Sequence, residues 1–477
     1  MVFSSAIFLT FFFPLIFLLH YTSSTKYRNR ILIAASIFFY AWSAPNFIWI
    51  LLTLTAVDYF LTKKMHEITY QKRKRELLIA SICINLGILI YFKYFNFFIE
   101  NINVILTQWS LNGVEVTKII LPIGISFFCF ETLTYSIDIY SGRVKPLEKL
   151  SDYYLYIFFF PKLIAGPIVR FQLIENYIPG PNRILNHQNI IEGFGRFVIG
   201  LAKKILIANT LGQFVDANIG SDSALINGMA ISTAWLTIIS YSFQIYFDFS
   251  GYSDMALGLA KMFGFSLPEN FDNPYTSKSI TEFWRKWHIT LGNWMREYLY
   301  IPLGGNRGGK LKMITNLWLV FLVSGLWHGA SWNFVIWGAY HGLFLVADRF
   351  FLEKLLLRFG SFVSTIFTFI VVLIGWVFFR IESLDTAMIF LSRMFTFNIG
   401  DSQLFISSEF WVTIIFAAIC SFATSNKYGK KFENLIYYKN NFYKYPLIST
   451  LLLLFIFSIC LGKITTNGFN PFIYFRF

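Results

Sequence analysis

The amino-acid sequence predicts an all-α membrane protein that crosses the bilayer many times, and three observations point to this fold class. Of the 477 residues, 56% are hydrophobic and only 14% are charged, whereas soluble domains carry about 25% charged residues. The mean hydropathy is +0.56. Basic residues gather in short clusters between long apolar runs, which is the positive-inside pattern of integral membrane proteins. The net charge of +14 therefore indicates membrane topology rather than nucleic-acid binding.

The N-terminal part predicts one span followed by a helical hairpin. Residues 4–20 are apolar, with no basic region before them and no small-residue cleavage site, so we expect a retained first span rather than a signal peptide. Residues 31–62 are apolar but interrupted by SAPN at 43–46, which predicts two helices joined by a tight turn. The basic clusters at 25–30 and 63–76 flank this hairpin and place the N-terminus outside.

The following apolar runs predict further spans, one of them irregular. We expect helices over 78–98 and 119–140. The segment 154–171 carries two prolines, a lysine and a glycine, which predicts a broken or re-entrant element. Long apolar helices are expected over 190–215 and 228–262. Spans near 361–379, 409–424 and 446–462 complete a single domain over residues 1–477 with about eleven or twelve membrane helices.

Asp248 and Asp254 lie in one of these long apolar helices. Carboxylates at such positions usually face the protein interior and often serve function. The structural alternative is that Ser250, Ser253 or the backbone satisfies them, and the residues alone leave the choice open. No internal repeat is visible, which argues against an inverted-repeat transporter. The four cysteines are scattered singly and have no CxxC pair, so they indicate neither a metal cluster nor a disulfide framework.

Residues 283–342 concentrate the unusual side chains, with three of the six histidines and seven of the thirteen tryptophans. Over 283–300, Trp284, Trp287 and Trp294 recur at helical spacing and predict one amphipathic helix at the cytoplasmic interface. His288 borders this aromatic stripe. A histidine beside tryptophans is more often structural than chemical, so its role stays open at this point.

A basic glycine-rich loop follows this predicted helix. Gly304 to Lys310 has the spacing of a phosphate-binding loop, but Leu311 stands where Ser or Thr is needed, and no strand is predicted before it. The sequence therefore excludes a nucleotide-hydrolysing loop. Arg307, Lys310 and Lys312 are candidates to meet the phosphates of a cytosolic cofactor, and the alternative is an ordinary positive-inside turn.

His328 lies in the next apolar helix, which we expect to place it near the middle of the bilayer. Gly325 and Gly329 leave room beside it, and an ionisable group at that depth is a candidate functional residue. Desolvation disfavours the charged form and leaves a neutral imidazole that can accept a proton. His341 lies 13 residues further on, about 220° around an ideal helix, so we expect it to face away and to be structural.

These blocks resemble the membrane-bound O-acyltransferase (MBOAT) superfamily, and more narrowly the bacterial alginate O-acetyltransferase type with its peptidoglycan O-acetyltransferase relatives. The resemblance covers nearly the whole chain, with its core motifs within 154–342. The matching blocks read FPKLIAGPIVR (160–170), DFSGYSDMALGLAKMFG (248–264), NFDNPY (270–275), FWRKWHITLGNWMREYLYIPLGGN (283–306) and SGLWHGASWNFVIWGAYHG (324–342).

The resemblance implies a helical fold pierced by a central channel, with the acyl donor entering from the cytoplasm and the acceptor from outside. It implies that His328 is the catalytic histidine and that His288 is the second motif histidine. Acetyl-CoA is the implied donor substrate, with no permanently bound cofactor and no metal. The residues expected to support the channel are Asp248, Asp254, Trp327 and Asn333.

The end of the chain, FIYFRF at 472–477, resembles a C-terminal motif of this type and of the machinery for teichoic-acid D-alanylation. Tyr474 matches its tyrosine, which implies an acyl relay through Tyr474 to an extracytoplasmic partner, such as a periplasmic SGNH-type protein. The alternative is a hydrophobic tail or interface anchor. A phenol with a pKa near 10 loses its proton more readily than a sugar hydroxyl, and its ester stays activated for a second transfer.

The expected function is therefore acetyl transfer from cytosolic acetyl-CoA for O-acetylation of an extracytoplasmic polysaccharide, whether alginate, peptidoglycan or another exopolysaccharide. The expected location is the bacterial cytoplasmic (inner) membrane. One alternative within the same superfamily is D-alanyl transfer from a carrier protein to teichoic acid. An alternative of another class is a solute transporter, which a polytopic chain with buried ionisable groups also allows.

Overall fold

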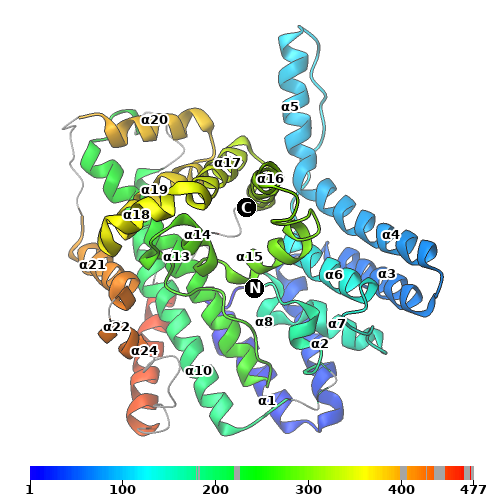
Figure 1. Ribbon diagram of the computed structural model, residues 1–477. Helices are drawn as coiled ribbons and strands as arrows, with labels where there is room; N and C mark the ends of the chain where they lie inside the picture. The colour runs from blue at the N-terminus through cyan, green and yellow to red at the C-terminus, as the bar shows by residue number, and fades with distance from the viewer. Residues whose placement is uncertain are drawn as a thin grey trace. The chain divides into compact units, whose positions relative to one another are not determined.

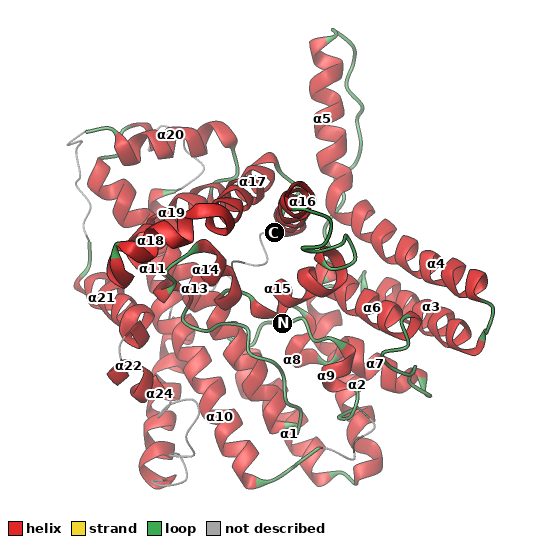
Figure 2. Cartoon of the chain, viewed as in Figure 1, coloured by secondary structure: helices red, strands yellow, loops and turns green. Residues whose placement is uncertain are grey.

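The structure is a computed structural model, and it describes residues 1–178, 180, 183–219, 226–397, 406–425, 427–433, 446–466 and 473. Within these residues the regular structure is helical, and the only β-type pairing is an isolated bridge between Phe271 and Trp287. Figure 1 colours the helices in chain order, and Figure 2 marks helices and loops. The all-α fold class predicted from the sequence is confirmed. By its contacts the chain divides into two compact units, residues 1–190 with 259–268, and residues 191–258 with 269–477.

The first unit contains the N-terminal helices. They are η1 (Phe8–Phe12), α1 (Phe13–Thr22), α2 (Thr25–Ser43), α3 (Ile48–Glu67), α4 (Gln71–Leu89), η2 (Ile90–Tyr94), α5 (Phe95–Gln108), α6 (Ile125–Tyr140), α7 (Leu150–Phe158), α8 (Phe160–Leu163) and α9 (Phe171–Ile174). The predicted hairpin is confirmed, because α2 ends at Ser43, two residues before Pro45, and α3 begins at Ile48. The predicted span over 78–98 is longer in the structure, where α4, η2 and α5 run on continuously over residues 71–108.

The predicted broken element is also confirmed. The helical turns of α7 and α8 end at Leu163, and no helix follows until α9. Lys162 within it is buried and pairs with the equally buried Glu131 of α6. A buried charge is tolerated where an opposite charge and hydrogen bonds compensate its lost hydration. Lys162, which makes this segment a poor membrane span, thus joins it to α6 through a buried ion pair with Glu131.

The second unit contains the remaining helices. They are α10 (His187–Ala202, whose first residues belong to the first unit), η3 (Lys203–Ala208), α11 (Asn209–Asn218), α13 (Ile231–Met262, whose last turn belongs to the first unit), η4 (Pro274–Thr276), α14 (Ile280–Lys286), α15 (Ile289–Met295), η5 (Arg296–Tyr300), α16 (Lys310–His328), α17 (Trp332–Ala347), η6 (Asp348–Leu352), α18 (Glu353–Arg358), α19 (Gly360–Arg380), α20 (Leu384–Phe395), α21 (Ser408–Phe422), η7 (Ala423–Ser425), α22 (Lys427–Glu433) and α24 (Pro446–Thr466).

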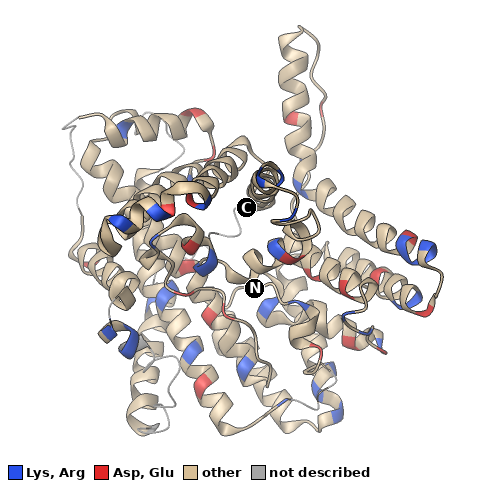
Figure 3. Cartoon of the chain, in the orientation of Figure 1, with Lys and Arg blue, Asp and Glu red and all other residues tan. Residues whose placement is uncertain are grey.

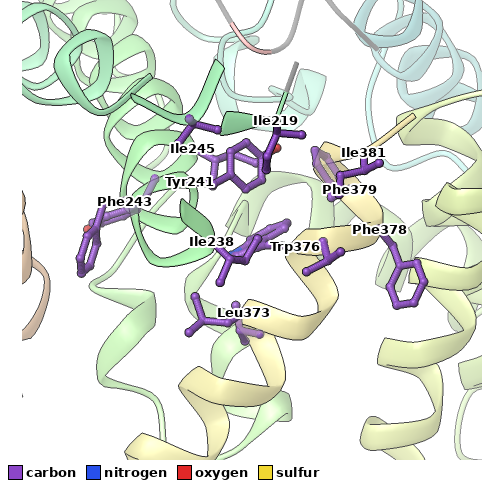
Figure 4. Close-up of a cluster of buried hydrophobic side chains, with 14 of the residues drawn as sticks. Ile219, Ile238, Tyr241, Phe243, Ile245, Leu373, Trp376, Phe378, Phe379 and Ile381 are labelled. Carbon is purple, nitrogen blue, oxygen red and sulfur yellow. The ribbon is translucent and has the colours of Figure 1, made fainter. Parts of the chain in front are cut away.

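One cluster of buried apolar side chains from α13, α14, α17, α19 and α21 forms the core of this unit. In Figure 4, Ile238 of α13 lies beside Trp376 of α19, and Leu373 lies one turn before Trp376 on the same helix. Because the cluster joins elements that are far apart in sequence, it fixes α14 and the C-terminal part of α19 against α13. These are the elements that surround the two motif histidines.

Helices α10 and α13 approach each other closely along a line of glycines. A Cβ atom added to Gly251 would lie 2.7 Å from the carbonyl oxygen of Gly200, and one added to Gly258 would lie 2.5 Å from that of Gly193. Small residues permit such backbone contact between membrane helices. The contact brings η3, which continues α10, against the middle of α13, where the two predicted carboxylates lie.

Six helices of the described residues are long and apolar enough to cross a membrane, the longest being the continuous segment over 71–108. The chain is therefore a multi-pass membrane protein. The total of eleven or twelve spans stays a prediction. Helix α13, with 32 residues, is long enough to cross a bilayer at about 1.5 Å per residue, although it carries charged side chains.

Candidate active site

His288 interrupts the helix that the sequence predicts over 283–300. Helix α14 ends at Lys286 and α15 begins at Ile289, and His288 between them has the left-handed backbone angles φ 47° and ψ 53°. The expectation of one continuous amphipathic helix is therefore wrong. The helix breaks at His288 because a different set of backbone hydrogen bonds forms there. The N–H of Asp272 donates to the carbonyl of Lys286, and the N–H of Ile289 donates to the carbonyl of Asn270, each at 3.0 Å.

The side chain of Asn270 determines the tautomer of His288. Its Oδ1 accepts hydrogen bonds from the N–H of Thr290 at 3.2 Å and from the Thr290 hydroxyl at 2.9 Å, which identifies this atom as the amide oxygen. The same oxygen lies 3.1 Å from Nδ1 of His288. Because an amide oxygen only accepts, Nδ1 must carry the proton. Nε2 is then the basic nitrogen of a neutral imidazole.

Burial supports this neutral form. The ring of His288 is buried and packs edge-on against Phe249 of α13, with centroids 4.8 Å apart. Burial lowers the pKa of His288 from 6.5 to about 3. A neutral imidazole in a dry site can accept a hydrogen bond or a proton at Nε2, whereas it presents no N–H there to a developing oxyanion.

His328 lies at the tip of a tight helical hairpin. It is the last residue of α16, and the chain reverses over residues 329–331 before α17 begins at Trp332. The two helices touch backbone to backbone, since a Cβ atom on Gly325 would lie 2.2 Å from the carbonyl oxygen of Phe334, and one on Gly338 would lie 2.4 Å from that of Phe321. Only glycine permits this approach, which holds the tip of the hairpin together.

The hairpin overturns the helical-wheel argument about His341. Because the chain reverses after His328, the two histidines belong to different helices and the angle of about 220° between them does not apply. His341 is nevertheless buried between Trp284 and Trp337, with ring centroids 5.0 and 5.1 Å away. Its surroundings are aromatic, which fits the structural role expected for it.

Trp327 brings the two motif histidines together. Its ring lies 6.2 Å from that of His288 and 4.9 Å from that of His328, so both imidazoles contact the same indole. The series continues, since Trp337 lies 5.2 Å from His328 and 5.1 Å from His341. Histidine and tryptophan rings thus alternate along the site, mostly edge to face, a geometry that the charge distribution of aromatic rings favours.

The end of α19 closes the other side of His328. Phe379 packs against the His328 ring at 5.2 Å. The Asn333 amide at the start of α17 donates to the carbonyl of Ile381, which ties the end of α19 to the hairpin. Both motif histidines are therefore buried among aromatic rings, with exposed fractions of 1% for His288 and 4% for His328. Such a site excludes water and favours general-base chemistry.

The two intramembrane carboxylates pair with cations, so the expectation that Ser250 and Ser253 satisfy them is wrong, whereas the expected backbone partner is confirmed for Asp248, which accepts from the N–H of Ile473. Asp248 Oδ1 lies 2.7 Å from the ammonium of Lys204, and Asp254 lies 2.7 Å from Lys203 and 2.9 Å from Arg196. An opposite charge compensates the hydration that a buried carboxylate loses. The signal in the sequence was the Lys-Lys pair at 203–204 inside an apolar run.

The basic loop before α16 is exposed at the other end of the hairpin from His328. Arg307, Lys310 and Lys312 are all exposed, and the stem of Lys312 lies over the glycine backbone of the loop. Lys310 precedes His328 by 18 helical residues, or about 27 Å along the axis. Helix α17 runs back to this same end of the antiparallel hairpin, where η6 and α18 carry Arg349, Lys354 and Arg358. Figure 3 marks these residues in blue. The positive-inside rule predicts that this end faces the cytoplasm.

A cavity that the sequence did not predict lies beside α14. Its volume is about 930 Å³, and three lysines and two carboxylates are among its lining residues: Lys278, Lys286, Lys430, Asp272 and Glu282. The N-terminal half of α19 supplies its apolar side. Helix α14 turns its charged side to this cavity and its aromatic side to the histidines. The cavity therefore lies one short helix away from His288.

The remaining predictions concern Tyr474, a metal site and the cysteines. Tyr474 lies outside the described residues, although Ile473 before it is described. Within the part of the chain that the structure describes, no group of three His, Cys, Asp or Glu side chains has the geometry to hold a metal ion. All four cysteines are free thiols.

Comparisons with known proteins identify the family of the chain. The sequence profile of the membrane-bound O-acyltransferase family matches residues 37–384. The chain is 38% identical to a probable alginate O-acetylase of Pseudomonas putida, over the full length of both proteins. It is 37% identical to a peptidoglycan O-acetyltransferase of Helicobacter pylori, covering 86% of this chain and 82% of that protein. Similarity to a teichoic acid D-alanyltransferase of Streptococcus thermophilus is lower, 28% over 51% of this chain and 60% of that protein.

The buried neutral imidazole of His288 predicts acid sensitivity of the fold. The folded form stays neutral down to about pH 3, whereas the unfolded chain takes up a proton near pH 6.5. Acid therefore favours the unfolded state, and this contribution to stability is complete above pH 6.5 and lost progressively below it. The melting temperature in detergent should fall less between pH 7 and pH 5 for His288→Gln than for the wild type.

The matched control for this measurement is His187→Gln, because His187 is exposed at the start of α10. This variant should keep the acid sensitivity of the wild type. Equal losses in the wild type and His288→Gln would contradict the buried neutral imidazole.

Proposed function

The chain belongs to the membrane-bound O-acyltransferase family and is an O-acyltransferase, and we propose that it transfers acetyl groups from cytosolic acetyl-CoA to an extracytoplasmic polysaccharide. The observation that carries this proposal is the pair of buried imidazoles on either side of Trp327. The full-length similarity to a probable alginate O-acetylase supports acetyl as the group transferred. The proposed location is the bacterial cytoplasmic membrane.

In the proposed reaction His328 is the general base. The oxygen of an acceptor hydroxyl attacks the thioester carbonyl carbon as His328 takes the hydroxyl proton. The tetrahedral intermediate then collapses, the carbon–sulfur bond breaks, and the proton passes to the departing thiolate. The surrounding aromatic rings exclude water, which would otherwise compete with the acceptor for the acetyl group.

The tautomer of His288 defines its proposed part in this step. Since Nδ1–H is directed to Asn270, Nε2 offers a lone pair and not a proton. We therefore assign His288 the task of accepting a hydrogen bond from an amide N–H of the donor and so orienting the thioester, because the single proton of the acceptor hydroxyl goes to His328. A direct role in stabilising the oxyanion would require His288 to be protonated first.

His328→Ala should abolish acetyl transfer while the protein still folds and inserts. The expected loss is about 10²–10⁴-fold in kcat, the usual contribution of a positioned general base. Transfer is measured as release of coenzyme A and acetylation of the polysaccharide by membranes that contain equal amounts of protein. The control is His341→Phe, which replaces the histidine that packs among tryptophans and should retain activity. Wild-type transfer by His328→Ala would refute the assignment.

Donor recognition requires cations, because coenzyme A carries several phosphates. The basic end of the second unit offers two sets. The exposed loop cations are Arg307, Lys310 and Lys312, and Lys310 lies about 27 Å from His328 along α16. We propose that these three attract the anionic donor from solution. The lysines of the cavity beside α14 lie closer to His288, and we propose that they hold the phosphates of the bound donor.

These two roles predict different salt dependence. Lys286 already pairs with Glu282 at 2.8 Å, so the cavity variant combines Lys278→Ala with Lys430→Ala. This variant should raise the KM for acetyl-CoA about tenfold at both low and high ionic strength. The loop variant, Arg307→Ala with Lys310→Ala, should lower kcat/KM only at low ionic strength, because salt screens exposed charges beyond about 10 Å.

The control for both variants is Lys427→Ala, which removes an exposed lysine from the same helix as Lys430. Its KM should equal that of the wild type. If the loop variant raised KM at high salt and the cavity variant did not, the phosphates would bind at the loop instead.

We further propose that Tyr474 receives the acetyl group first and passes it to an extracytoplasmic partner, such as an SGNH-type protein, which acetylates the polymer. An aryl ester remains activated for a second transfer, because phenolate is a better leaving group than a sugar alkoxide. This relay would link a cytosolic donor to an acceptor outside the cell, where no coenzyme A is present.

Tyr474→Phe removes the hydroxyl and keeps the ring. Acetylation of the polysaccharide should fall to background, and the mass increase of an acetyl group on the C-terminal peptide should disappear. Tyr428→Phe is a matched control, since Tyr428 is an exposed tyrosine on α22. Unchanged polymer acetylation in Tyr474→Phe would exclude the relay.

D-alanyl transfer is the second candidate within this family. The similarity to a teichoic acid D-alanyltransferase covers only about half of this chain, which favours the acetyl group. Membranes given labelled acetyl-CoA should consume it, whereas a D-alanyl enzyme would require a charged carrier protein. A transporter, in contrast, would move a solute without transferring any acyl group.

A further inference from the structure

The last described residue of the chain is held by a buried carboxylate. The backbone N–H of Ile473 donates to Oδ2 of Asp248 at 2.8 Å, across 225 residues of sequence. Both residues are buried, with exposed fractions of 6% for Ile473 and 1% for Asp248. The side chain of Ile473 belongs to the same apolar cluster as Trp287 and Trp376. The contact is therefore part of the interior of the second unit.

The two oxygens of Asp248 have separate partners. Lys204, itself buried, lies 2.7 Å from Oδ1, and the Ile473 N–H takes Oδ2. The lysine neutralises the carboxylate charge and orients it, so that the second oxygen is directed at the main chain of the C-terminal segment. Because the donor is a backbone N–H, the contact recognises the position of the segment rather than one particular side chain.

Asp254 provides the contrast. It lies six residues later on α13, and its partners are the side chains of Lys203 and Arg196 on η3 and α10. Asp254 therefore joins two long helices and contacts nothing from the C-terminal segment among the described residues. Of the two intramembrane carboxylates, Asp248 alone contacts the described end of the chain.

The position of Asp248 relates this contact to the active site. The next residue on α13, Phe249, packs against the ring of His288 at 4.8 Å. Tyr246 lies two residues before Asp248, and its ring centroid is 6.1 Å from that of Trp287. Trp287 immediately precedes His288 in the chain. One turn of α13 therefore contacts both the C-terminal segment and the surroundings of His288. Tyr474 is bonded directly to Ile473.

We propose that Asp248, oriented by Lys204, is a positioning residue that docks the C-terminal segment at Ile473 and so presents Tyr474 for acetylation. This inference rests on the proposed function. In the step it serves, a bond forms between the phenol oxygen of Tyr474 and the acetyl carbon, and the carbon–sulfur bond of the donor breaks. The phenol proton passes to His328 and then to the thiolate.

The first test measures the docking itself, independently of catalysis. Ile473→Cys is introduced into a chain whose four native cysteines are replaced by alanine, with and without Asp248→Ala. In detergent, a maleimide should label the new thiol of Ile473→Cys about tenfold faster when Asp248→Ala is also present. A charge-assisted hydrogen bond contributes about this factor to the docked state. Asp248→Asn retains an accepting oxygen and should restore much of the protection.

The second test measures the consequence for transfer in the full chain with its native cysteines. Asp248→Ala should reduce acetylation of Tyr474, read by peptide mass, about tenfold, while the KM for acetyl-CoA stays at the wild-type value. Asp248→Asn should recover part of this loss. The control is Asp58→Asn, which changes a buried carboxylate of the first unit and should leave labelling of position 473 and acetylation of Tyr474 unchanged.

The outcomes separate this inference from the relay on which it rests. Unchanged labelling in Asp248→Ala would show that the carboxylate does not dock the segment. Faster labelling with normal acetylation of Tyr474 would show docking that does not serve transfer, which also overturns the proposal. If Tyr474→Phe leaves polymer acetylation intact while labelling responds to Asp248, the relay fails and the docking contact stands.

Discussion

The active site depends on one hydrogen-bonded arrangement, in which the amide of Asn270 holds the left-handed turn at His288. A positive φ is unfavourable for a residue other than glycine, and such strain persists only where the surroundings compensate it. Here the compensation comes from Thr290, from the imidazole itself and from the backbone bonds that flank the turn. Without them the chain from α14 to α15 would continue as one helix, as its periodicity suggests, and the imidazole would not be directed into the site.

A second reversal, at the tip of the α16–α17 hairpin, performs the same task for His328. Both motif histidines thus lie where a helix ends rather than within one. At a helix end the side chain is free of the direction that a continuing helix imposes, and elements from different parts of the chain can converge on it. That is how Trp327 comes to contact both imidazoles, with Phe249 and Phe379 closing the opposite sides.

Much of the scaffold could be predicted from sequence, because its signals are local. The turn at 43–46 and the broken segment at 154–171 follow from proline, glycine and a misplaced lysine. The break at His288 could not be predicted in this way, because its cause lies at Asn270, outside the helical pattern that surrounds the histidine. The cationic partners of Asp248 and Asp254 were missed for the same reason. Serines were near in sequence, whereas the cations that neutralise them lie on η3 and α10, brought close by the glycine contacts of Gly200 and Gly251.

Helix α13 therefore carries two carboxylates that have different kinds of partner. At Asp254 its charge fixes the neighbouring helices, and at Asp248 a similar carboxylate, with only one lysine to neutralise it, retains an oxygen for the backbone of Ile473. The difference of one cation separates a structural ion pair from a docking site. Because Phe249 on the same turn contacts His288, any shift of this part of α13 would move the docking oxygen and the imidazole together. The geometry thus couples the position of Ile473 to the position of His288, the residue proposed to orient the thioester.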